Sequence, residues 1–168
     1  MNIKEIIGDY NIFLDKIMLN LDKIGIDSFD LLEIDHICFR VNSYERYDVK
    51  KGELENFGEL RSENIISGRP IAIYELNEPL VYGEYIIKCV EIPAPKENKH
   101  YIEELEHAEF VIKISLKEFL EKYKNIDFNM SASEREINPE IIIDFGDCAV
   151  KFHEEGILDV VKRREESK

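Results

Sequence analysis

Two acidic-histidine pairs are the residues of this sequence with the clearest potential for chemistry. Asp35-His36 opens the run DHICFRV, and Glu106-His107 opens the run EHAEFVI 71 residues later. Side chains in both runs alternate with the period of two that is typical of β-strands, and a helix-like segment follows each run. Two copies of one unit that each supply a histidine at the same place could build a shared metal site.

Alternation along each strand predicts which side chains accompany the histidines. His36 shares its face with Cys38 and Arg40, and His107 shares its face with Glu109. The acidic residue before each histidine falls on the opposite face, so we do not expect it to support that imidazole. Glu109 lies close enough to be a candidate for proton transfer.

The last strand of each unit is the second source of ligands. EYIIKCVEI places Glu91 near its end, and CAVKFHEE places Lys151 and His153 on one face and Glu154 on the other. Imidazole and carboxylate together suit zinc, which is our first expectation, or nickel, manganese or iron. A shift of one residue in register would exchange His153 for Glu154, and water is a third option. The predicted metal ligands are His36, Glu91, His107 and His153.

Three basic side chains predict an anionic ligand. Arg40 lies on the face of His36, Arg69 is in phase with the inward residues of IAIYEL, and Lys151 lies at the end of the last strand. We expect these three groups to bind substrate. Both arginines also have a structural explanation, since they can pair with glutamates in a buried polar network.

Composition excludes several classes of protein. The net charge of −14 repels nucleic acids and anionic lipid surfaces, and no apolar run approaches the ~20 residues of a membrane span. The three cysteines, Cys38, Cys89 and Cys148, lack the short paired spacings of a zinc site or a disulfide framework. We therefore predict a cytoplasmic protein with a small-molecule ligand and no nucleic-acid or membrane partner, as a monomer or a homodimer.

The elements that must position these residues follow the order β-α-β-β-β twice. Helical spacing over residues 3–24 and a short second helix near 27–32 predict an N-terminal helical extension, residues 1–32. The first unit is predicted as strand 34–41, helix 43–56, a strand after Gly58, the strand IAIYEL, a turn over 77–83 and the strand EYIIKCVEI. The second is predicted as strand 106–114, helix 115–124, a weak strand near 126–132, strands 140–145 and 148–153, and a closing helix after Gly156.

Several tracts resemble the YecM family, within the vicinal-oxygen-chelate superfamily of glyoxalases, extradiol dioxygenases and bleomycin-resistance proteins. They are DHICFRV, FGELRSENIISGRPIAIYELNEP, CVEIPAPK, EHAEFVI, INPEIII and VKFHEEGILDVV. The resemblance implies an α+β fold in which two β-α-β-β-β modules, 33–93 and 105–156, curl into one open, cup-shaped barrel within a domain spanning 33–168. It also implies metal ligands on the first and last strands of each module. Many relatives carry glutamate at the place of Lys151, which as a protonated amine cannot bind a cation.

Three functions from different classes compete at this point. The first is a metal-dependent isomerase, lyase or dioxygenase that acts on a small oxygen-rich anionic metabolite. The second is a metal-free protein that binds or sequesters a small molecule without turnover. The third is a structural protein whose N-terminal helices contact a partner. We rank them in this order, and whether the protein is an enzyme is left open because fold alone does not give function.

Overall fold

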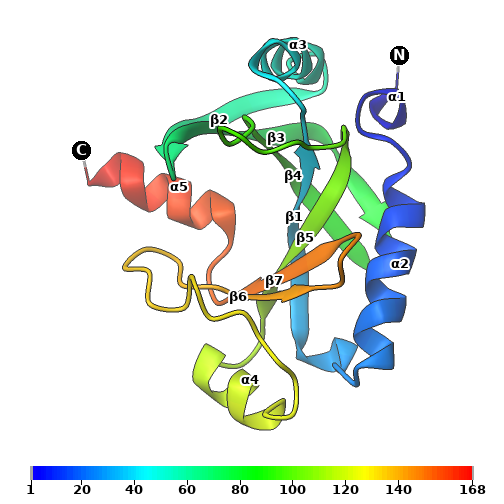
Figure 1. Ribbon diagram of the computed structural model, residues 1–168, viewed down its shortest axis with the longest axis vertical. Coiled ribbons are helices and arrows are strands. Elements are labelled where there is room, and N and C mark those ends of the chain that lie inside the picture. The colour runs from blue at the N-terminus through cyan, green and yellow to red at the C-terminus, as the bar shows by residue number, and fades with distance from the viewer. Residues whose placement is uncertain (1, 168) are drawn as a thin grey trace.

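A single seven-stranded sheet, curled but not closed, organises the computed structural model, which describes residues 2–167 (Figure 1). The strand order is β2-β3-β4-β1-β5-β7-β6. The strands are β1 (Leu31–Arg40), β2 (Gly58–Ile66), β3 (Arg69–Tyr82), β4 (Tyr85–Pro93), β5 (Glu104–Ile112), β6 (Ile141–Asp144) and β7 (Ala149–His153). The helices are α1 (Ile3–Ile7), α2 (Tyr10–Lys23), α3 (Tyr44–Leu54), α4 (Leu116–Lys122) and α5 (Ile157–Glu166), with a 3₁₀ turn at Ser28–Asp30.

The sheet has two similar halves that meet at β1 and β5. These strands pair antiparallel in the middle of the sheet, and each pairs in parallel with the last strand of its own half, β1 with β4 and β5 with β7. The order β1-α3-β2-β3-β4 is followed by β5-α4-β6-β7. The predicted α+β class and curled sheet are therefore confirmed.

The helices divide between the two faces of the sheet. Leu14, Ile17 and Leu21 of α2 are buried in the main core, on the stripe that the helical spacing predicts. Ile157 and Leu158 of α5 pack on the opposite face, against a smaller cluster of residues from β3 and β4. Figure 1 shows α2 and α5 on opposite sides of the strands. The concave side is thus partly covered by α5.

Local structure differs from the predictions at four places. The first helical segment is two helices, because Gly8 takes φ +84° and Asp9 caps α2. The short second helix is only the 3₁₀ turn, since Leu31 already pairs with Ile112. The turn predicted over 77–83 belongs largely to β3, and the weak strand near 126–132 is reduced to one bridge between Asn129 and Ile142. In the last three cases pairing with another strand decides the outcome.

No helix within residues 2–167 is both long enough and apolar enough to cross a membrane.

Candidate functional site

The concave face of the sheet encloses a cavity of about 760 Å³, which we call the cup. Both halves of the sheet line it, through residues of β1, β3, β4, β5 and β7, and α5 contributes Ile157 and Val160. A loop over 129–140 forms part of the wall. Titratable side chains gather in the cup, at the centre of the sheet where the halves meet.

Glu109 lies at the centre of this group. Its Oε1 is 3.1 Å from Nε2 of His107, 3.3 Å from Nε2 of His36 and 2.6 Å from Nζ of Lys151. Its Oε2 is 3.3 Å from Nε2 of His153. One buried carboxylate on β5 therefore contacts three imidazoles and an ammonium group.

Glu91 completes the predicted meeting of both halves. Its two oxygens lie 3.8 Å from Nε2 of His36 and 3.8 Å from Nε2 of His107. One ligand atom from each of His36, Glu91 and Glu109 falls within 4.8 Å of the others. The structure thus brings together His36, Glu91 and His107 as the alternation predicts, and adds Glu109 between them.

Two β-bulges explain why Asp35 and Glu106 leave the predicted alternation. Ile34 pairs with Phe110 and His36 with Glu109, so Asp35 is the extra residue on β1. A second shift between Cys38 and Phe39 makes Glu106 the extra residue on β5. A bulge turns its side chain out of the regular pleat. Our prediction that the acid would not support the histidine it adjoins was wrong for Asp35, because alternation assumes an unbroken strand. Glu106 also lines the cup, but it pairs with Arg40, and no hydrogen bond joins it to His107 in the described chain.

Asp35 supports His36 in the structure, although the sequence analysis did not assign it this role. Its Oδ2 is 2.9 Å from Nδ1 of His36, and both its oxygens accept the backbone N–H of Ile157 at the start of α5. This contact leaves Nε2 of His36 facing Glu109 and Glu91 without a hydrogen-bond partner among the described residues. Asp35 therefore connects the imidazole to the N-terminus of α5.

The two histidines experience opposite fields. Burial acts to lower the pKa of His36, but the carboxylates of Glu109 and Asp35 outweigh burial and hold that pKa well above its usual value. Burial and then the Lys151 ammonium lower the pKa of His107 to about 4. His107 is consequently neutral at pH 7, the form that can bind a metal.

Lys151 keeps the neighbouring carboxylates ionised. Burial acts to raise the pKa of both Glu91 and Glu109, but Lys151, helped by the histidines, more than offsets burial and holds both pKa values below normal. Lys151 itself has a raised pKa, because Glu109 and Glu91 outweigh the effect of its burial. At neutral pH the group is therefore a set of charged carboxylates around one protonated amine.

His153 and Glu154, the alternatives for a fourth ligand, occupy different places. His153 is fully buried beside His36, with ring centroids 6.5 Å apart, and does not line the cup. Glu154 accepts the backbone N–H of Leu116 and so caps α4. Of the two residues, only His153 contacts the candidate metal ligands, through its contact with Glu109.

The predicted arginines differ in their surroundings. The guanidinium of Arg40 forms an ion pair with Glu106 and lies over the ring of Tyr101, 5.1 Å from its centroid. Arg69 is 7 % exposed and lines the cup, and it forms no ion pair with any residue that the structure describes. Pairing with a glutamate in a buried polar network, the structural explanation given for both arginines, therefore applies to Arg40 only.

Glu140 is an inward acid that the sequence reasoning passed over. It is buried, lines the cup, pairs with Arg135 at 2.9 Å and lies 3.6 Å from Nζ of Lys151. Burial, followed by the charge of Glu109, raises its pKa. Its place just before the apolar run IIID was a signal that could have identified it.

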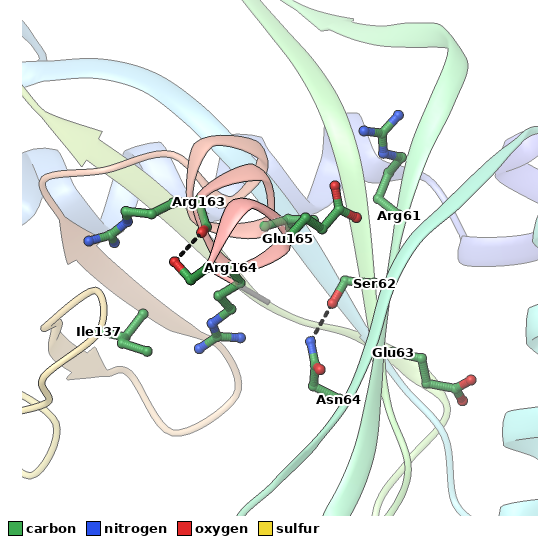
Figure 2. A pocket seen from close by; sticks show the side chains of 10 residues that line it. Arg61, Ser62, Glu63, Asn64, Ile137, Arg163, Arg164 and Glu165 are labelled. Atoms are coloured by element: carbon green, nitrogen blue, oxygen red, sulfur yellow. Dashed lines mark hydrogen bonds between the residues drawn. The ribbon is translucent and has the colours of Figure 1, made fainter.

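A second cavity of about 650 Å³ lies between β2 and α5 (Figure 2). It is lined by charged and polar side chains such as Arg61, Glu63 and Arg163, and no histidine or cysteine of the described chain lines it. Arg61 and Arg163 are held by glutamates. The cup, where imidazoles and carboxylates converge, is therefore the stronger candidate for chemistry.

Comparison with known proteins gives a family and a fold. The family model described as YecM protein matches residues 2–164. Protein YecM of Escherichia coli K12 is 30 % identical over 145 residues, covering 77 % of each protein. A solved structure described as Structural Genomics, Protein EC4020, is 26 % identical with a TM-score of 0.73, covering 97 % of this chain and 96 % of that one.

A more distant structure shares the fold alone. A variant of methylmalonyl-CoA epimerase from Streptomyces coelicolor, solved in complex with 2-nitronate-propionyl-CoA, superposes with a TM-score of 0.52 at 13 % identity. The match covers 73 % of this chain and 96 % of the epimerase. The architecture is thus of the vicinal-oxygen-chelate type.

Proposed function

The chain belongs to the YecM family, and from this premise we propose that it is a divalent-metal-binding protein of the vicinal-oxygen-chelate type. In this proposal the modules 33–93 and 105–156 form one cup. The protein would catalyse an isomerase, lyase or dioxygenase step on a small, oxygen-rich anionic metabolite. The observation that carries the proposal is the convergence of His36, Glu91, His107 and Glu109 from both halves of the sheet.

The donor set fits a divalent metal. Nε2 of His36 is buried without a hydrogen-bond partner among the described residues, and two ionised carboxylates lie within 4 Å of it. His107 is neutral, and Asp35 holds Nδ1 of His36, an arrangement that commonly orients a metal-binding imidazole. Zinc suits two imidazoles and two carboxylates, and nickel, manganese or iron are the alternatives.

A competing set, Cys38, Glu106 and His107, is less suitable. Its ligand atoms also lie within 4.8 Å of one another. Burial, however, raises the pKa of the Cys38 thiol well above normal, so the thiolate form that binds metals is disfavoured. Glu106 is already paired with Arg40.

Glu109 is better suited to bind the metal than to act as a base. A carboxylate whose pKa is held well below normal is a weak proton acceptor at pH 7 but a good ligand for a cation. We therefore place Glu109 as the fourth ligand in preference to His153, with His153 positioning it from behind. Glu140, whose pKa is raised, is our candidate for holding a proton in the cup.

The remaining residues would bind and orient the ligand. A divalent ion here would supply Lewis acidity toward two adjacent oxygens of the ligand. Lys151 also lines the cup, beside Glu109, and its Nζ can donate a hydrogen bond to a ligand oxygen. Ile71 and Ile157 give the cup an apolar wall that excludes water from one side.

Metal content tests the proposal directly. Protein purified without an affinity tag should carry about one transition metal per chain by elemental analysis, and His36→Ala and His107→Ala should lose it. His100→Ala is the matched control, because this histidine is exposed in the linker between the halves. Absence of metal in the wild type after incubation with zinc, nickel, manganese and ferrous iron would overturn the proposal.

A further inference from the structure

Arg69 is a buried cation of the cup without a counter-ion. It is 7 % exposed, and its Nε and Nη1 have no hydrogen-bond partner within residues 2–167. Arg40, Arg135 and Lys151, which also line the cup, are paired with Glu106, Glu140 and Glu109 respectively. An unpaired buried charge is destabilising, so it is expected where a ligand supplies the missing acceptor.

The position of Arg69 on β3 fixes where this acceptor would lie. Ile73 of β3 is opposite Glu91 of β4, and Arg69 lies four residues before Ile73 on the same face. Four residues of strand span about 13 Å, so the backbone of Arg69 is well separated from the metal ligands along the cup. Because Arg69 and Glu91 both line the cup, a ligand held at Glu91 could reach Arg69 with its far end.

The charge of the cup differs in sign from that of the whole chain. The chain carries −14, yet among residues 2–167 seven basic and five acidic side chains line the cup. Three further basic residues of the lining, Lys96, Lys99 and Arg164, form no ion pair with any residue that the structure describes. Arg164 lines the second cavity as well, where Figure 2 shows it between Ile137 and Asn64. The cup thus combines a buried arginine with further unpaired cations in its lining, a field that attracts a small anion.

We propose that Arg69 binds a terminal carboxylate or phosphate of the ligand, at the end remote from the metal-facing oxygens. The ligand class is then a short acid with two adjacent oxygens at one end and a second anionic group at the other. The planar guanidinium binds either oxyanion in bidentate fashion. This inference rests on the proposed metal function for the near end of the ligand and adds the far end.

Pairs of ligands that differ only in the terminal anionic group measure the contribution of that group to binding. Calorimetric titration of the zinc-loaded protein compares 2-oxopentanedioate with 2-oxopentanoate, which differ only in the terminal carboxylate, and 3-phosphoglycerate with glycerate, which differ in the terminal phosphate. We expect one doubly anionic probe to bind roughly 10- to 100-fold more tightly than its partner, the range of a charge-assisted hydrogen bond. The pair that shows the ratio identifies the oxyanion.

Arg69→Met should remove this discrimination while leaving the zinc content unchanged. Arg61→Met is the matched control, an arginine on the neighbouring β2 that lies outside the cup and near Glu59 and Glu75. We expect the affinity ratio to fall close to one in Arg69→Met and to stay at the wild-type value in Arg61→Met. A ratio near one for both probe pairs in zinc-loaded wild type would overturn the inference while leaving the metal function standing.

A stability measurement without metal gives an independent readout. If Arg69 is unpaired in the free protein, Arg69→Met should melt at the wild-type temperature or above it in the presence of a chelator. A melting temperature several degrees below wild type would show that Arg69 has a structural partner, and would overturn the inference. Failure of the proposed function would instead appear as absence of zinc from the wild type.

Discussion

The two halves of the sheet have the same backbone arrangement but different chemistry at equivalent positions. In the first half His36 pairs with Cys89 and Cys38 with Glu91; in the second, His107 pairs with Ala149 and Glu109 with Lys151. The histidines therefore correspond, Cys38 corresponds to Glu109, and Glu91 corresponds to Lys151. The first half keeps its carboxylate on the last strand, whereas the second half carries it on the first strand, beside a lysine.

This exchange changes the roles of the two histidines. Asp35 and Glu109 favour the protonated form of His36, whereas Lys151 and burial favour the neutral form of His107. A metal would displace a proton from His36, whereas neutral His107 would only have to shift the Nε2 proton that it donates to Glu109 onto its other ring nitrogen. A symmetric fold thus supports an asymmetric site, and variants at corresponding positions can test that asymmetry.

Glu109→Gln should have the largest effect, because Glu109 is the buried contact of three histidines and Lys151. Loss of the carboxylate leaves the part-buried Lys151 without its closest counter-ion, which we expect to cost about 3 kcal/mol in the free energy of unfolding, the lower end of the range for buried pairs. Zinc should also be lost. Chemical denaturation and elemental analysis measure both. Cys38→Ala, at the corresponding position of the first half, is the control and should retain zinc; zinc retained by Glu109→Gln would refute the placement.

The second effect is the dependence of stability on pH in the metal-free protein. His107 has a pKa of about 4 in the fold and about 6.5 when unfolded, so the unfolded chain binds an extra proton between these values. The contribution of His107 to the free energy of unfolding therefore falls as the pH drops from about 6.5 to 4, and the loss reaches about 3 kcal/mol at the lower pH. His36 has the opposite sign: its raised pKa adds stability that is fully present below about pH 6.5 and is lost as pH rises through the folded value.

Histidine titration by NMR separates these two contributions. The His107 ring should stay neutral down to about pH 4, while the His36 ring should still carry its proton at about pH 6.5. The same titration midpoint for both rings, near the value of a free imidazole, would remove the asymmetry between the halves.

Lys151→Glu places a glutamate at the position that corresponds to Glu91, so both halves then carry a carboxylate there. We expect this variant to gain zinc affinity. Replacing the ammonium by a carboxylate beside Glu109 should tighten zinc binding about 10- to 100-fold, since charges a few ångströms apart interact by several kcal/mol even in a screened interior. The same change should destabilise the metal-free protein. Lys113→Glu, an exposed lysine with the same charge change, is the control. Zinc affinity unchanged by Lys151→Glu would place the metal away from β7.

The fold and the site differ in how far the sequence could predict them. Period-two alternation and turn residues were enough for the main strands of both halves, and the spacing of the histidines was enough to bring His36 near His107. Alternation failed at Asp35, because a bulge has no fixed sequence signal and depends on pairing with a distant strand. It could have identified Glu140, which precedes an apolar run, but not the central place of Glu109, since contacts between strands depend on how the sheet curls.

The smallest expected effect concerns the bulge itself. Asp35→Asn keeps the shape of the side chain but removes the charge beside Nδ1 of His36, and we expect zinc affinity to fall roughly tenfold, the lower range for residues that orient a ligand. The N-terminus of α5 should loosen slightly, because it loses the stabilising negative charge of Asp35, although the amide oxygen of an asparagine can still accept the N–H of Ile157. Glu33→Gln is the control: it lies two residues earlier on β1, and no hydrogen bond joins it to His36 in the described chain.

Competitive titration against a fluorescent zinc chelator measures the affinities of wild type, Asp35→Asn and Glu33→Gln. Equal weakening in both variants would assign the effect to the negative charge of this end of β1, and no weakening in Asp35→Asn would remove Asp35 from the site. A loss of zinc affinity confined to Asp35→Asn would mean that the β-bulge at Asp35 serves two purposes. It orients the less favourable of the two histidines, and it joins that histidine to the helix that covers the cup.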